Sequence, residues 1–199
     1  MAKRAVYAFD FDGTLTLRDS FFALIRHAKG LPALCAGLAR LALPLAGAVL
    51  HLTDRSLVKE RLFAHFFSGM DAADFDHLCE RFAKENGGIL RPGAMDAVRD
   101  ACARGTAVIV SASAENWVRP FFAGLAVEVI ATRLETAGGQ LTGQFLDANC
   151  TGAEKVRRLA ARFPDRASYT LTAYGDSEGD RELLAFADEA HFSRSGDNR

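Results

Sequence analysis

The amino-acid sequence predicts an α/β fold, in which a mostly parallel sheet forms the middle of three layers and a separate α-helical segment is inserted. Short apolar runs alternate with amphipathic helical segments from residue 89 onward, as in consecutive βαβ units. Residues 18–88 show only the 3.6-residue period of helices, without a strand pattern. We therefore expect two domains, a core formed by residues 1–17 and 89–199 and a helical insert formed by residues 18–88.

The apolar pattern predicts each element of the core. The first strand covers residues 4–9 (RAVYAF) and ends abruptly at Asp10. The later elements are a helix over 94–104, a strand over 106–110, a helix over 115–124, a strand over 127–131, a hairpin that turns at Gly138-Gly139, a helix that ends at Pro164, a strand over 168–174, a helix over 180–187 and a short strand over 190–192.

The helical insert contains three predicted helices, which begin after Asp19, Asp54 and Asp71. Gly30 followed by Pro32 predicts the end of the first one. The apolar residues that recur at helical spacing are Phe21, Leu24, Ile25 and Ala28 in the first helix, Val58, Leu62 and Phe66 in the second, and Phe75, Leu78, Cys79 and Phe82 in the third.

Composition excludes some classes of protein. The 199 residues include 24 Lys plus Arg and 25 Asp plus Glu, a formal net charge of −1 that argues against a cationic nucleic-acid binder. A hydrophobic content of 49% is typical of an ordered globular chain. The four cysteines form no C-x-x-C pair, and the apolar run over residues 5–9 is too short for a signal peptide. We therefore expect reduced thiols and a cytoplasmic location.

Polar side chains follow three of the predicted strands at their carboxyl ends, where ligands bind in open parallel sheets. A cation, Lys155, lies in the first turn of the helix that Gly152 precedes. Because a cation there opposes the helix dipole, an anionic ligand explains Lys155 better than helix stability does. The polar residues at the strand ends are Asp10 and Asp12, Ser111 and Ser113, and Asp176 and Asp180.

Carboxylates that crowd one edge of a sheet raise one another's pKa values unless a cation joins them. Oxygen ligands without His or Cys suit Mg²⁺, which binds one or two carboxylates together with waters and a substrate phosphate. These residues therefore predict a Mg²⁺-assisted phosphoryl-transfer site.

The motifs that carry these residues resemble, in order, the four motifs of the haloacid dehalogenase superfamily of phosphatases. They are segment 10–16 (DFDGTLT), Ser111, Lys155 and segment 175–180 (GDSEGD). The helical segment directly after the first motif is similar to the cap of the subclass that contains phosphoserine phosphatase and phosphatidylglycerophosphatase C. The resemblance implies a Rossmann-like core with an α-helical cap, and an aspartyl-phosphate mechanism.

The resemblance also implies catalytic roles. Asp10 would be the nucleophile that attacks phosphorus, and Asp12 would protonate the leaving alcohol and then activate water. Lys155 would neutralise charge on the nucleophile and the phosphoryl group. Mg²⁺ would bind Asp10, the backbone carbonyl of Asp12 and Asp176, while Asp180 is better explained as orienting this ligand set than as replacing one of its members.

Four residues are expected to contact the substrate. Ser111 and the backbone amide of Ala112 would hold phosphate oxygens. Gly13, which allows a tight turn, is also expected to be one of the substrate-binding residues. Asp19 lies where the phosphoserine-specific members carry an acid that meets the substrate amine, although a helix N-cap explains Asp19 equally well.

Residues 31–52 form the most unusual stretch of the insert, because Arg40 and His51 are almost its only ionisable groups. Pro32, Pro44 and Arg40 argue against a membrane crossing. A buried cap core, a peripheral membrane contact and an oligomer contact all stay open. The similarity to phosphatidylglycerophosphatase C makes an amphiphilic or lipid phosphomonoester the leading substrate.

Other functions stay open as well. A phosphatase for phosphoserine or another small polar phosphomonoester, or a phosphotransferase, would use the same residues. A phosphate-binding regulatory protein is the alternative without turnover, but such a protein would not need Asp12 beside Asp10.

Overall fold

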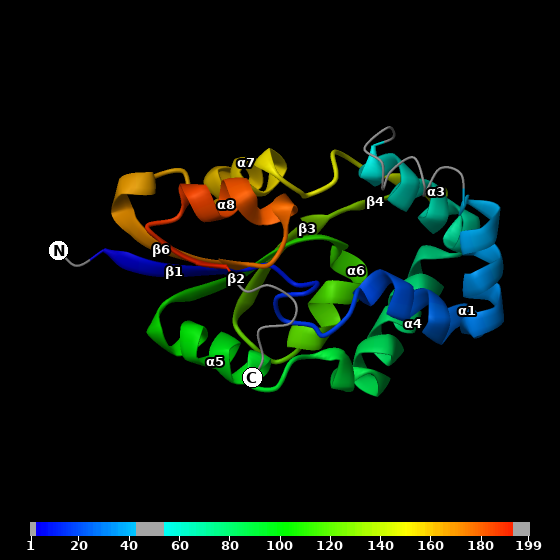
Figure 1. The fold of residues 1–199 in the computed structure, drawn as a ribbon, viewed down its shortest axis with the longest axis horizontal. Helices are drawn as coiled ribbons and strands as arrows, with labels where there is room; N and C mark the ends of the chain where they lie inside the picture. The colour runs from blue at the N-terminus through cyan, green and yellow to red at the C-terminus, as the bar shows by residue number, and fades with distance from the viewer. Residues whose placement is uncertain (1–2, 43–53, 193–199) are drawn as a thin grey trace.

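The core of the computed structural model, which describes residues 3–42 and 54–192, is a five-stranded parallel sheet (Figure 1). Its order is β3-β2-β1-β6-β7, and each of its neighbouring strand pairs is parallel. The strands are β1 (Arg4–Phe9), β2 (Thr106–Ala114), β3 (Val127–Thr132), β6 (Tyr169–Gly175) and β7 (Glu189–Phe192). The predicted parallel sheet is confirmed.

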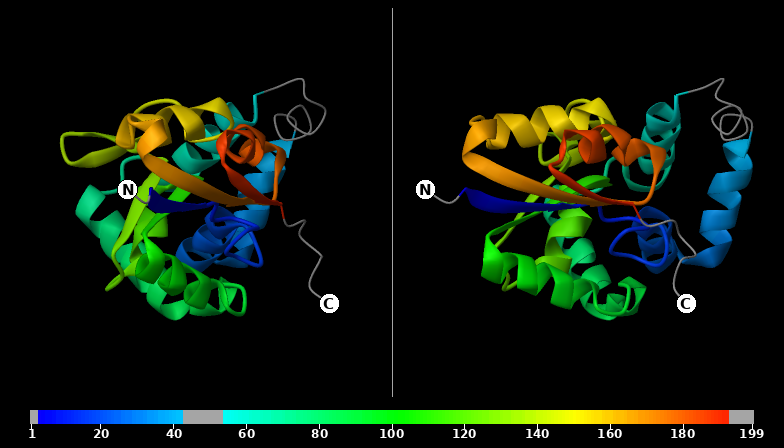
Figure 2. Two further views of the ribbon diagram at one scale, coloured as in Figure 1. Left: turned by 90° about the vertical axis from the view of Figure 1, so that its left-hand side faces the viewer. Right: turned by 60° about the vertical axis from the view of Figure 1, so that its left-hand side comes forward.

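Helices cover both faces of this sheet, which gives three layers (Figures 1 and 2). One face carries α5 (Ala94–Arg104) and α6 (Glu115–Val118), and the other carries α7 (Ala153–Arg162) and α8 (Arg181–Phe186). Successive side chains of a strand point to opposite faces. Accordingly, Ala107 and Ile109 of β2 belong to one buried apolar cluster, whereas Val108 and Val110 belong to the other.

Three helices form a group beyond the carboxyl ends of β1, β2 and β6 (Figure 1). They are α1 (Ser20–Arg40), α3 (Arg55–Phe67) and α4 (Ala72–Glu85), and we call them the helical segment. The carboxylates of Asp19 and Asp54 accept hydrogen bonds from backbone amides of the first turns of α1 and α3, and so cap both helices. The apolar side chains of the segment join the same buried cluster as one face of the sheet, which fixes the segment against the core.

Helix α1 breaks at Gly30, where the sequence predicts the end of the first helix, and a second helical stretch follows the break. Gly30 has φ 83° and ψ 165°, values outside the helical region, and helical geometry resumes from Leu31 to Arg40. Pro32 is tolerated because it lies in the first turn after the kink, where its missing N–H would have no helical partner.

The described half of the apolar segment 31–52 is the second half of α1. Leu34 and Gly37 are buried there, whereas Leu31 is 54% exposed. A Cβ on Gly37 would lie 2.4 Å from Cζ of Phe66, so α1 and α3 approach closely at this point. Residues 43–53 lie outside the described residues. Within residues 3–42 and 54–192, no helix is both long enough and apolar enough to cross a membrane.

An antiparallel hairpin, β4 (Leu134–Ala137) with β5 (Gln140–Phe145), confirms the predicted two-glycine turn and packs on α3. The amide of Phe145 donates to Oε2 of Glu60 over 2.9 Å. Gly143, at φ +91°, leaves room for α3, because a Cβ there would lie 2.7 Å from Cβ of Ala64. The hairpin therefore connects the core to the helical segment.

Two elements differ from the sequence prediction. Strand β2 continues past residue 110 to Ala114. The helix expected over 115–124 is the short α6 followed by a 3-10 helix, because Pro120 lacks the N–H that would continue the α-helical pattern. The 3-10 helices are η1 (Gly87–Ile89), η2 (Arg119–Phe122), η3 (Arg166–Ser168) and η4 (Glu178–Asp180).

Arg158 holds α7 against the end of β3. Its guanidinium donates to the carbonyl of Ala131 and to Oδ1 of Asp147, each over 2.6 Å, and to Oε1 of Glu154 over 2.7 Å. The side chain is only 10% exposed, which protects these charge-assisted bonds from water. This clamp fixes the first turn of α7, and so the position of Lys155.

We expect Glu154→Gln to lower the free energy of unfolding by roughly 1 kcal/mol at neutral pH. Hydrogen bonds from Arg157, and then from Arg158, lower the pKa of Glu154 from 4.5 to about 2. A depressed pKa contributes stability that is present above the unfolded value and is lost as the pH falls toward the folded one. Urea denaturation should therefore show a difference between variant and wild type that shrinks between pH 4.5 and pH 2. A pH-independent difference would contradict this account.

Candidate active site

A buried cluster of three charges lies where β1, α7 and η4 meet. Nζ of Lys155 lies 2.5 Å from Oδ1 of Asp10 and 2.5 Å from Oδ1 of Asp180. All three side chains are nearly inaccessible to solvent. A lysine in the first turn of α7 opposes the helix dipole, but the two carboxylates compensate for it. Three parts of the chain that are distant in sequence are thereby joined.

Burial and mutual repulsion shift the pKa values of these groups. Burial raises the pKa of Asp10 to about 7, with Lys155 acting in the opposite direction and Asp180 adding to the rise. Burial also disfavours the charged form of Lys155, but the charges of Asp10 and Asp180 outweigh it and raise the lysine pKa. The pKa of Asp176 is raised by burial and then by the charge of Asp180. One lysine therefore does not fully compensate the carboxylates.

Asp10, Asp176 and Asp180 form an acidic cluster that could hold a metal ion. Each offers a carboxylate oxygen, and these oxygens lie within 4.8 Å of one another. A ligand set of carboxylate oxygens suits a hard divalent cation such as Mg²⁺. An added cation would also relieve the repulsion that raises the pKa values of Asp10 and Asp176.

Gly13 makes room for Asp176. A Cβ on Gly13 would lie 2.1 Å from Oδ2 of Asp176, and Gly13 has φ +84°, which favours glycine. The hydroxyl of Thr14 donates to Oδ1 of Asp176 over 3.2 Å. The guanidinium of Arg91 donates to the carbonyl of Gly13 and fixes the turn. The role of Gly13 that the structure shows is thus steric, because it leaves space for the carboxylate of Asp176. A contact between Gly13 and the substrate stays a prediction.

Asp180 is held at both carboxylate oxygens. While Oδ1 meets Lys155, Oδ2 accepts hydrogen bonds from the backbone amides of Asp176 and Ser177, over 3.2 and 3.1 Å, and from the hydroxyl of Ser177 over 2.8 Å. These bonds fix the turn that carries Asp176.

Asp12 has different surroundings from Asp10. Its Oδ1 accepts a hydrogen bond of 2.7 Å from the backbone amide of Ser20, at the start of α1, and its Oδ2 accepts one from the hydroxyl of Ser113. Sequence reasoning placed Ser113 at a strand end but assigned it no role, and it missed Ser20. In the sequence, Ser20 is one polar residue at a helix start, so nothing distinguishes it.

Ser111 and Ala112 lie where β2 departs from its register with β3, between the pairs Ser111–Ala131 and Ala114–Thr132. The Ser111 hydroxyl is buried and accepts a bond from the amide of Ser113 over 3.0 Å. The Ala112 carbonyl accepts from Nζ of Lys59, on α3, over 3.0 Å. Sequence reasoning did not place Lys59, because its helix shows only an amphipathic pattern.

Asp19 caps α1, as the alternative explanation predicts. Its Oδ1 accepts from the amides of Phe21 and Phe22 over 2.9 and 3.1 Å. Desolvation by surrounding protein atoms, and then the charge of Asp12, raise the pKa of Asp19, and Lys59 opposes the rise. Asp19 is therefore close to both the site and the helical segment, and its contact with substrate stays a prediction.

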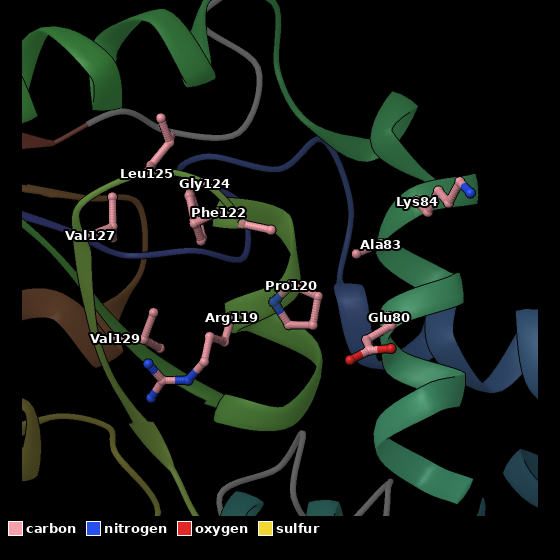
Figure 3. Close-up of a pocket in the computed structure, with 11 residues that line it drawn as sticks. Glu80, Ala83, Lys84, Arg119, Pro120, Phe122, Gly124, Leu125, Val127 and Val129 are labelled. Atoms are coloured by element: carbon pink, nitrogen blue, oxygen red, sulfur yellow. The ribbon is translucent and has the colours of Figure 1, made fainter. Parts of the chain in front are cut away.

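Asp19 also lines a cavity of about 580 Å³, whose wall comes from α1 and from residues at η1. The wall combines the cations Arg18 and Arg26 with apolar side chains, including Phe22 and Leu31. A second cavity, of about 620 Å³, lies between α4, η2 and β3, and its wall contains none of the carboxylates described above (Figure 3).

The chain belongs to the haloacid dehalogenase-like hydrolase family, whose model matches residues 7–185. Protein CicA of Caulobacter vibrioides is 38% identical over 186 residues, which cover 92% of this chain and 82% of that protein. The predicted family and the expectation of an enzyme are thereby confirmed.

Solved structures share the fold. A protein from Bordetella pertussis Tohama I has a TM-score of 0.80 at 20% identity, covering 95% of this chain and 89% of its own. A substrate-bound phosphoserine phosphatase has a TM-score of 0.64 at 18% identity, covering 96% and 87%. An HAD family hydrolase from Salmonella enterica serovar Typhi has 0.67 at 20% identity, covering 93% and 61%. The predicted α/β fold with a phosphoserine phosphatase-like arrangement is confirmed.

We expect Lys155→Met to lower the free energy of unfolding by about 3 kcal/mol, because it leaves Asp10 and Asp180 buried without a cation. Urea denaturation in the presence of a chelator measures this loss. The double variant Lys155→Met/Asp180→Asn should recover part of it, since one uncompensated charge is removed. A loss below about 1 kcal/mol for the single variant would show that the cluster is not held by charge pairing.

Proposed function

We propose that this protein is a Mg²⁺-dependent phosphomonoester phosphatase that forms an aspartyl-phosphate at Asp10. The observation that supports it best is the buried group of Asp10, Lys155 and Asp180 beside Asp176, at the carboxyl ends of parallel strands. Residues 18–88 would act as a cap over a core of residues 1–17 and 89–199.

In the first step, Oδ2 of Asp10 attacks phosphorus in line with the ester bond. The bond between phosphorus and the ester oxygen breaks, and Asp12 gives its proton to the leaving alcohol. Lys155, which is held on Oδ1 of Asp10, keeps the nucleophile oriented and balances the charge on the phosphoryl group. Ser111 and the amide of Ala112 bind phosphoryl oxygens.

In the second step, Asp12 is a carboxylate and takes a proton from water. The water oxygen attacks phosphorus, the acyl phosphate bond breaks, and Asp10 returns as a carboxylate with release of inorganic phosphate. Asp12 ends protonated, as it began, so protons balance over the cycle. The residues that would hold Mg²⁺ are Asp10, the carbonyl of Asp12, and Asp176, with Asp180 orienting them. When bound, Mg²⁺ supplies positive charge to the phosphoryl oxygens.

We also propose a class of substrate, from the cavity beside Asp19. The 580 Å³ cavity beside Asp19 pairs exposed apolar side chains, Phe22 and Leu31, with the cations Arg18 and Arg26. This combination suits a leaving group with an apolar body and an anionic part, and so favours an amphiphilic or lipid phosphate. A cytoplasmic location, with peripheral membrane contact through residues 31–52, stays a prediction.

Asp10→Asn should reduce phosphomonoester hydrolysis roughly 1,000-fold or more, because an amide oxygen is a poor nucleophile for phosphorus. Phosphate release measures the loss, and circular dichroism checks the fold. Asp74→Asn is the matched control, since Asp74-Phe75-Asp76 repeats the same three-residue sequence in the first turn of α4. Substantial residual activity in Asp10→Asn would reject Asp10 as the nucleophile.

A substrate panel tests the class of phosphate and the need for metal. We expect phosphate release from phosphatidylglycerol phosphate and lysophosphatidate to exceed that from phosphoserine and sugar phosphates, and a chelator to abolish all of it. Arg18→Ala and Arg26→Ala should lower the preference for the lipids. A preference for small polar phosphates would reject the amphiphilic substrate while leaving the phosphatase proposal in place.

A further inference from the structure

Ser113 lies between two residues of the candidate site, Ser111 and Asp12. It is fully buried at the irregular end of β2. Its amide donates to the hydroxyl of Ser111 over 3.0 Å, and its own hydroxyl donates to Oδ2 of Asp12. Ser113 therefore contacts both the expected phosphate-binding residue and the expected acid.

A chain of hydrogen bonds leads to Ser113 from Trp117. The indole Nε1 of Trp117 donates to Oγ of Ser20 over 3.1 Å, and Oγ of Ser20 lies 3.4 Å from Oγ of Ser113. All three side chains are buried, with Trp117 only 1% exposed. Water is thereby excluded from this chain.

The donor at one end, Trp117, and the acceptor at the other, Asp12, give the hydrogen-bond chain a single direction. An indole N–H can only donate a hydrogen bond, and a carboxyl oxygen that carries no proton, such as Oδ2 of Asp12 when the proton is on Oδ1, can only accept one. Ser20 therefore accepts from Trp117 and turns its own proton toward Ser113, and Ser113 turns its proton toward Asp12. Hydrogen bonds in a chain of one direction polarise and strengthen one another.

We propose that Ser113 is a positioning residue for the carboxyl of Asp12, and that Trp117 and Ser20 fix the direction in which Ser113 donates. This rests on the proposed function, in which Asp12 protonates the leaving alcohol. Ser113 keeps its proton throughout. With the backbone amide of Ser20 on Oδ1 and the hydroxyl of Ser113 on Oδ2, both oxygens of the carboxyl are held, which restricts its rotation.

Two aryl phosphates that differ in leaving group test this role. p-Nitrophenoxide leaves readily without protonation, whereas phenoxide needs the proton of Asp12 more. In Ser113→Ala, kcat/KM should therefore fall at least about 10-fold more for phenyl phosphate than for p-nitrophenyl phosphate. A merely structural role would lower both values by the same factor. Trp117→Phe should shift the ratio in the same direction, by a smaller factor.

Phe63→Leu is the matched control for packing. Phe63 stacks on Trp117, at 6.4 Å between ring centroids, but takes no part in the hydrogen-bond chain. This variant should lower stability and leave the ratio of the two kcat/KM values unchanged. If Ser113→Ala does not fold, Trp117→Phe decides the question.

A second readout does not depend on turnover. The chain has one tryptophan, so its indole N–H gives a single NMR resonance. Asp12→Asn and Ser113→Ala should each shift this resonance, because both variants change the hydrogen-bond chain that begins at the indole N–H.

The outcomes separate this proposal from the function on which it rests. An unchanged ratio of kcat/KM values in folded Ser113→Ala and Trp117→Phe overturns the role of Ser113, while hydrolysis by the wild type keeps the phosphatase proposal. If the wild type hydrolyses neither ester nor any lipid or polar phosphate, the phosphatase proposal fails, and the role of Ser113 fails with it.

Discussion

The contact of Lys155 with Asp10 and Asp180 is the constraint around which the core is arranged. A buried lysine costs several kcal/mol in desolvation unless anions surround it, and here the anions come from the end of β1 and from η4. The first turn of α7 must therefore lie over the carboxyl end of β1. The clamp of Arg158 on the end of β3 serves the same purpose, since it fixes α7 in that position.

Asp10 and Asp12 are two residues apart, yet their surroundings differ in kind. Asp10 faces a lysine and further carboxylates, and of these only Lys155 favours the charged form that the proposed nucleophile needs. Asp12 is held by neutral donors, an amide of α1 and a hydroxyl of β2, which suits the proton exchange proposed for it. The position of Asp12 depends on the helical segment, whereas that of Asp10 depends on the core alone.

Local patterns predicted the strands, their parallel arrangement and the meeting of Asp10, Lys155 and Asp176, because strand ends in a parallel sheet share one edge. The break of α1 at Gly30 was predicted as well, since a glycine followed by a proline two residues later ends a helix. Ser20 and Lys59 were missed. They reach the site only through the packing of α1 and α3 against the core, and amphipathic periodicity does not say which polar residue of a helix faces a neighbour.

The close approach of Gly13 to Asp176 makes these two positions a single steric unit. Any side chain at position 13 would occupy the space of the carboxylate, and it would also have to adopt φ +84°. The two positions are therefore not free to vary independently in an alignment of related chains. A residue larger than glycine at position 13 should accompany a residue smaller than aspartate at position 176, and relatives that carry such a pair should lack this carboxylate.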